Sequence, residues 1–166
     1  MRRIVLLTLF SALAVSAPAG DQKSAEPLFK NIEVKHFPLA EGVELPPEFS
    51  DLLYAEIRKS LQKTGLYEQV TGEGEVLEAA DAPKSLILDG KIVEYKKGNV
   101  AKEVLIGLGA GRRSLRAQIT VRRVSDQQVV MDKELNVKAS SRWTPQVLAK
   151  SLADKVAGEL KKALRR

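Results

Sequence analysis

Two neighbouring segments alternate apolar and polar residues with a period of two, and this pattern constrains the fold more than any other feature. The segments cover residues 114–124 and 129–140, and only residues 125–128 separate them. A period of two is typical of strands with one buried face, and so short a connection permits only antiparallel pairing. Their inward residues are Leu115, Ala117, Ile119, Val121, Val129, Met131, Leu135 and Val137, with Lys133 as the exception. The chain therefore predicts an antiparallel hairpin with one apolar and one polar face.

One amphipathic helix is predicted before this hairpin in the sequence, and another is predicted after it. The first covers residues 47–63, where Leu53, Ile57 and Leu61 recur at helical spacing and Pro47 suits the first turn. The second follows Thr144 and Pro145 and continues to the cationic C-terminus. Its apolar stripe is Val147, Leu148, Leu152, Val156, Leu160 and Leu164.

Three further strands are predicted at residues 30–37, 66–71 and 85–95. The third contains Asp89-Gly90, which also suits a hairpin turn, but a turn there would leave two stubs, so we expect one continuous strand. Gly90 falls on its inner face, where a missing side chain permits close approach or a bulge. The expected order is β-α-β-β-β-β-α. This order predicts an α/β (α+β) fold in which two helices cover one face of a mixed, largely antiparallel sheet of about five strands.

The N-terminus is predicted to be an export signal. Arg2 and Arg3 precede an uncharged, mostly apolar run over residues 4–15, and Ala17 and Ala19 are small residues at the positions that a signal peptidase reads. We expect residues 1–19 to be a signal peptide, residues 20–27 a flexible lead-in and residues 28–166 a single domain. No later segment is long and apolar enough to span a bilayer, so the expected location is the periplasm.

Composition excludes several classes of function. The 166-residue chain has no cysteine, which excludes disulfides, thiolate nucleophiles and attachment of lipid through a cysteine. Its net charge of +6 becomes +4 when Arg2 and Arg3 are removed, so we expect no nucleic-acid partner. His36 is the only histidine, and its position indicates a half-buried strand residue without a second ligand or a nucleophile. We therefore expect no catalytic residue, metal or cofactor and no enzymatic activity.

A glycine segment between the third strand and the hairpin is the candidate functional region. The contact residues that it suggests are Leu105, Ile106, Gly107, Leu108, Gly109, Ala110, Gly111, Arg112 and Arg113. Three interpretations remain open. The alternating glycines permit close approach of another backbone; the segment is an exposed apolar loop that meets a protein or a membrane surface; or its amides and arginines hold a phosphate or nucleotide. The spacing matches neither the dinucleotide fingerprint nor the P-loop.

Several motifs resemble the family of domain of unknown function 4410. They are F-S-D-L-L, G-L-Y-E-Q-V, L-I-L-D-G-K-I-V-E-Y-K-K-G-N and I-G-L-G-A-G, and the likeness covers residues 29–164. The resemblance implies a bacterial envelope protein, distantly similar to periplasmic modules of curli-secretion lipoproteins. Members are often lipoproteins, but this chain lacks the cysteine that carries the lipid, so lipid anchoring is not expected. The expected function is a binding or assembly module that contacts envelope proteins, copies of itself, or weakly a membrane surface.

Overall fold

A computed structural model describes residues 29–75, 79–106, 111–140 and 144–165. The predicted signal peptide with Ala17 and Ala19, the lead-in, and the residues Gly107, Leu108, Gly109 and Ala110 lie outside these ranges. Among the described residues, no helix has the length and apolar character needed to cross a membrane.

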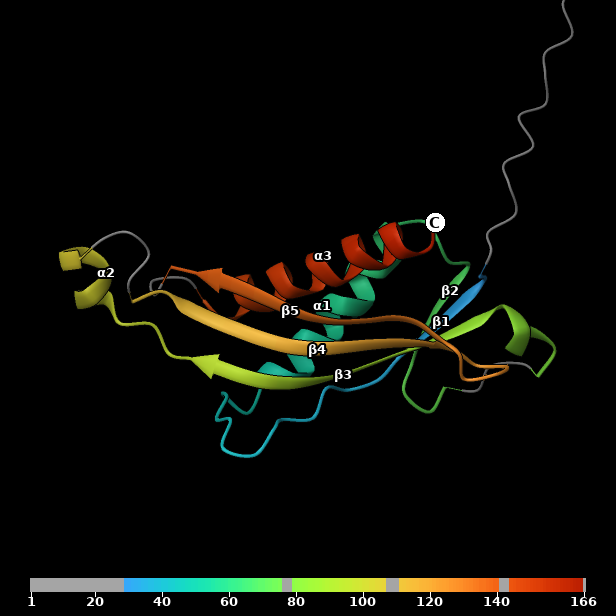
Figure 1. The fold of residues 1–166 in the computed structure, drawn as a ribbon, viewed down its shortest axis with the longest axis horizontal. Coiled ribbons are helices and arrows are strands. Elements are labelled where there is room, and N and C mark those ends of the chain that lie inside the picture. The colour runs from blue at the N-terminus through green and yellow to red at the C-terminus, as the bar shows by residue number, and fades with distance from the viewer. Residues whose placement is uncertain (1–28, 76–78, 107–110, 141–143, 166) are drawn as a thin grey trace, which may run out of the picture.

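The described chain forms one mixed sheet with helices (Figure 1). The elements are β1 (Asn31–Val34), α1 (Phe49–Lys63), β2 (Gln69–Gly72), a 3₁₀ helix (Ala79–Lys84), β3 (Ser85–Lys96), α2 (Val100–Ile106), β4 (Arg113–Arg123), β5 (Val129–Ala139) and α3 (Pro145–Ala163). The predicted α/β class, the five strands and both long helices are thus confirmed.

The strand order in the sheet is β2-β1-β3-β4-β5. The strand β1 lies between β2 and β3 and is parallel to both, whereas β3, β4 and β5 form a continuous antiparallel run. The parallel neighbours β1 and β2 are joined through α1, as parallel strands require a crossover connection. The predicted hairpin is the pair β4 and β5, in which Leu115 lies opposite Val137 and Ala117 opposite Leu135.

Both long helices cover the same face of the sheet (Figure 1). The helix α1 contributes Leu53, Ile57 and Leu61 to the core, and α3 contributes Leu152 and Val156. Burying each of the larger aliphatic side chains stabilises the fold by about 1.5–3 kcal/mol. The opposite face of β3, β4 and β5 has no such cover from the described helices and carries polar and charged residues, as the alternation predicts.

Gly90 confirms the expectation of close approach in the long strand. The strand β3 is continuous through Asp89-Gly90, and a Cβ atom at Gly90 would lie 2.6 Å from the Phe37 ring. Phe37 is buried in the core cluster. The bulge lies two residues further along, between Ile92 and Glu94.

The structure differs from the sequence-based expectations at Val129, at His36 and in the connection between β3 and β4. Val129 was expected on the inner face of the hairpin but is 53% exposed, because the pairing of β4 with β5 shifts register between Val121 and Arg122. The strand β1 ends at Val34, so His36 lies beyond it and is exposed instead of half-buried within a strand. The connection between β3 and β4, for which no helix was expected, contains α2. Lys133, the exception on the inner face, bonds through Nζ to Oε2 of Glu159 on α3, which explains why a charge is tolerated there.

Candidate binding surface at the α2 end

The helix α2 forms in the connection between β3 and β4 because its first turn is capped. The side-chain Oδ1 of Asn99 accepts a hydrogen bond from the backbone N–H of Lys102 at 3.0 Å, which is an N-cap contact. The backbone N–H of Asn99 also donates to the carbonyl oxygen of Gly111 at 2.6 Å. Gly111 has φ +78°, a conformation that favours glycine. This hydrogen bond joins Asn99, just before α2, to Gly111, just before β4. The helix α2 lies beyond the end of the sheet (Figure 1).

The helix α2 exposes large apolar side chains. The exposed fractions are 46% for Val100, 62% for Val104, 83% for Leu105 and 62% for Ile106. These are four of the six large apolar residues that are exposed in the described part of the chain. Four such residues within seven positions make a concentrated patch, and patches of this kind mark interaction sites.

Several basic residues lie in α2, in the segments next to it, or at the same end of the sheet. Lys97, Lys102 and Arg112 are exposed, and the sheet register places Lys96 and Lys138 on either side of Ser114 at the same end of the sheet. We call the exposed residues of α2 together with these five cations the α2 tip. Its hydrophobic part is Val100, Val104, Leu105 and Ile106, and its cations are Lys96, Lys97, Lys102, Arg112 and Lys138.

Two hollows border the α2 tip. One, of about 660 Å³, lies among Leu45, Pro46, Tyr95 and Pro145, with Glu44, Lys97, Gly98 and Arg113 also lining it. The other, of about 240 Å³, lies on the open face of the sheet. Its lining contains Lys96, Arg112, Arg116 and Lys138, with Glu94 as the one acid. The Glu94 carboxylate is bonded to Lys96 at 3.0 Å and to Arg116 at 3.2 Å, and Lys96 lowers the pKa of Glu94.

The predicted contact residues divide into three groups in the structure. Leu105 and Ile106 lie at the exposed end of α2, Gly111 closes the base of the segment, and Arg112 and Arg113 lead into β4. The four residues at positions 107–110 lie outside the described ranges. The glycines are followed by a strand, whereas the glycine-rich loops of dinucleotide-binding folds and P-loop proteins lead into a helix.

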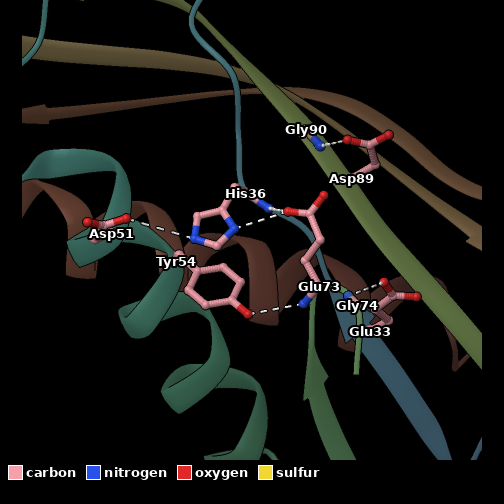
Figure 2. Close-up of polar contacts among 8 residues, drawn as sticks. All are labelled: Glu33, His36, Asp51, Tyr54, Glu73, Gly74, Asp89 and Gly90. Atoms are coloured by element: carbon pink, nitrogen blue, oxygen red, sulfur yellow. Dashed lines mark hydrogen bonds and ion pairs between the residues drawn. The ribbon is translucent and has the colours of Figure 1, made fainter. Parts of the chain in front are cut away.

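A second polar group forms where β1 and β2 end (Figure 2). The ring of His36 stacks on Tyr54 of α1, with 3.9 Å between ring centroids and 14° between planes. His36 Nδ1 lies 3.0 Å from Glu73 Oε2, and His36 Nε2 lies 3.9 Å from Asp51 Oδ1. The His36 backbone N–H also donates to Glu73 Oε2 at 3.1 Å, and this hydrogen bond is the main cause that lowers the pKa of Glu73.

These contacts tie three segments of the chain together. The Tyr54 hydroxyl accepts a hydrogen bond from the backbone N–H of Glu73 at 3.1 Å, and a Glu33 carboxylate oxygen accepts one from Gly74 at 3.5 Å. The segment after β1 and the turn after β2 are thereby fixed to α1. Across the described residues, no three histidine, cysteine or acidic side chains converge as metal ligands.

Sequence reasoning missed α2 and this His36 group for different reasons. The signal for α2 was present, because Asn99 is a favoured N-cap residue and Val100, Ala101, Val104 and Leu105 recur at helical spacing. His36 and Glu73 are 37 positions apart and meet only because β1 and β2 are parallel neighbours. No local pattern encodes that contact.

A family model covers more than half of the chain. Residues 39–130 match the model described as domain of unknown function (DUF4410). The chain belongs to the DUF4410 family. The match confirms the resemblance inferred from the motifs, and it includes β3, α2 and β4. A search of curated protein sequences finds no match.

Solved structures show that this DUF4410 chain shares its fold with other bacterial proteins. A single-residue variant of PelC from Paraburkholderia phytofirmans, solved as a dodecamer, is 17% identical with a TM-score of 0.58, over 80% of this chain and 89% of PelC. PelC itself, also a dodecamer, is 18% identical with a TM-score of 0.54, over 77% and 86% of the two chains. Protein XCC0632 from Xanthomonas campestris, of family DUF330, is 13% identical with a TM-score of 0.57, over 84% and 89%.

Proposed function

We propose that this chain is a non-enzymatic binding or assembly module of the bacterial cell envelope and that the α2 tip is its contact surface. The observation that carries the proposal is the exposure of Val104, Leu105 and Ile106 on α2, among basic side chains. Exposing these residues to water costs free energy that a partner would recover on binding. The export signal predicted over residues 1–19 supports the envelope as the place of action.

Site-specific photo-crosslinking in cells tests the contact surface. A photoreactive amino acid at Leu105 should give adducts, detected by mass spectrometry of the purified protein, because this side chain is 83% exposed at the proposed contact. The matched control is Val129, which is 53% exposed at the opposite end of β5. Adducts at position 105 that are absent at position 129 support the proposal. Equal yields at the two positions, or neither protein nor lipid adducts at position 105, contradict it.

Assembly with copies of itself is the second candidate function. It is favoured by the likeness to PelC, whose two structures are dodecamers. The strand β5 is an edge of the sheet, and an edge strand leaves backbone groups available for pairing. Size-exclusion chromatography with light scattering tests this candidate. A single species with the mass of the monomer at high protein concentration would contradict it.

A further inference from the structure

The shape and charge of the α2 tip indicate what it contacts. Resting on the proposed function, we propose that the α2 tip docks on an anionic lipid surface, with its apolar side chains among the headgroups and its cations beside the phosphates. The apolar residues are on a short helix that protrudes beyond the sheet instead of lining a groove (Figure 1). A protruding apolar helix suits a soft surface that can close around it.

The distribution of side chains on α2 suits an interfacial position. An interfacial helix lies in the plane of the boundary between headgroups and acyl chains, with its apolar face buried by about 5–10 Å. Val100, Ala101, Val104 and Leu105 occupy one side of the helix by their spacing, with Lys102 on another side. Such an arrangement places apolar groups in the boundary and a cation at the level of the phosphates.

The charge around α2 has the sign that an anionic surface requires. From Lys97 to Arg113 the sequence contains Lys97, Lys102, Arg112 and Arg113 against Glu103 alone, a net charge of +3. Lys138 adds a further exposed cation from the adjacent strand. Two acids border the tip: Glu94, already bonded to Lys96 and Arg116, and Glu44, which lines a hollow with Lys97. Basic residues near a membrane attract anionic lipids within about one Debye length.

Flotation with lipid vesicles tests the inference on the full folded protein after signal removal. With vesicles of phosphatidylcholine and phosphatidylglycerol at low salt the protein should float, and with phosphatidylcholine alone it should remain below. Leu105→Asp should weaken flotation about ten-fold, because it replaces an inserted apolar group by a charge. The control Val129→Asp should leave flotation unchanged, because Val129 lies at the other end of the sheet.

Separate variants test how much the cations of the α2 tip contribute to lipid binding. Replacing both Lys102 and Arg112 with Gln should weaken binding roughly five-fold for each charge, and added salt should weaken wild-type binding in the same direction. The control Lys91→Gln, on the open face of the sheet and away from the tip, should have no effect.

The outcomes separate this inference from the proposed function. Flotation that does not depend on lipid charge, or that Val129→Asp weakens as much as Leu105→Asp, overturns the inference. No flotation together with protein adducts at position 105 overturns the lipid surface as partner but leaves the contact surface in place. No flotation and no adducts at position 105 overturn both.

Discussion

At the residue scale, one position without a side chain determines how the segment after β1 packs on the sheet. Gly90 lies beneath Phe37, whose ring atoms occupy the space that a Cβ would need. We expect Gly90→Ala to destabilise the fold by about 1–3 kcal/mol, because the ring or the strand must move. Chemical denaturation measures the change.

The matched control for this prediction is Gly158, which is in α3 and has open space where a Cβ would be. Gly158→Ala should stabilise the protein by about 0.5–1 kcal/mol through its higher helix propensity. A destabilisation by both alanine variants would show that the contact with Phe37 is not the cause.

The Tyr67 hydroxyl is a second feature at the residue scale. It is buried, burial raises its pKa, and it has no hydrogen-bond partner among the described residues. An unpaired buried hydroxyl costs about 1–3 kcal/mol. We therefore expect Tyr67→Phe to leave stability unchanged or to raise it by about 1 kcal/mol, measured by thermal unfolding. A clear loss of stability would mean that the hydroxyl has a partner in the folded protein.

At the element scale, α2 depends on its cap. Asn99→Ala removes the oxygen that accepts the Lys102 N–H, and the loss of such a cap costs about 1 kcal/mol. We expect faster hydrogen exchange, by about five-fold, in a peptide that covers α2, with no change in β4 or α3. Asn99→Asp, which keeps an acceptor, should retain the slow exchange. Equal exchange in the alanine variant and the wild type would contradict the role of the cap.

The contact between β5 and α3 gives a prediction for acid stability. Lys133, and then Lys162, lower the pKa of Glu159 from its usual 4.5 to about 2. A lowered pKa stabilises the fold above the unfolded value of about 4.5, and this stability is lost as the pH falls towards 2. Glu159→Gln should therefore melt a few degrees below wild type at pH 7, and the two should converge towards pH 2.

The control for the acid prediction is Glu134→Gln, which removes an exposed carboxylate from β5 on the open face of the sheet. It should lower the melting temperature at pH 7 less than Glu159→Gln does. A difference between Glu159→Gln and wild type that stays constant from pH 7 to pH 2 would contradict the pKa of about 2.

The long elements could be predicted from sequence because each repeats its pattern several times. The helices α1 and α3 have four or more turns of apolar spacing. The strand β4 alternates along most of its length, and β5 alternates from Met131 to Ala139 with Lys133 as the exception. Short elements give no such repetition. The ends of β1 and β2 are set by parallel pairing, and α2 has two turns beside glycines that suggest a strand. The His36 group depends on that same pairing and on α1, so it became visible only in three dimensions.

At the scale of the whole molecule, the fold keeps the proposed contact surface apart from its core. The apolar residues of α1, α3 and the inner sheet face are buried, whereas those of α2 are exposed beyond the sheet. Substitutions at Leu105 or Arg112 should therefore change binding without unfolding the domain. Because the α2 tip and the turn between β4 and β5 lie at opposite ends of the sheet, docking through the tip would orient the molecule with that turn away from the surface.

A second prediction at the scale of the whole molecule concerns export, which can be tested by identifying the first residue of the mature protein. The described fold begins at Phe29, which is buried, so cleavage after Ala19 would remove no residue of the described core. We expect the protein recovered from the periplasm to begin at Gly20, as read by N-terminal sequencing. Ala19→Arg should block cleavage, because signal peptidase accepts only small residues at that position, whereas Pro18→Ala should be cleaved normally. Wild-type protein that keeps Met1 and remains with cytosolic enzymes would contradict export, and with it any role of the α2 tip in the envelope.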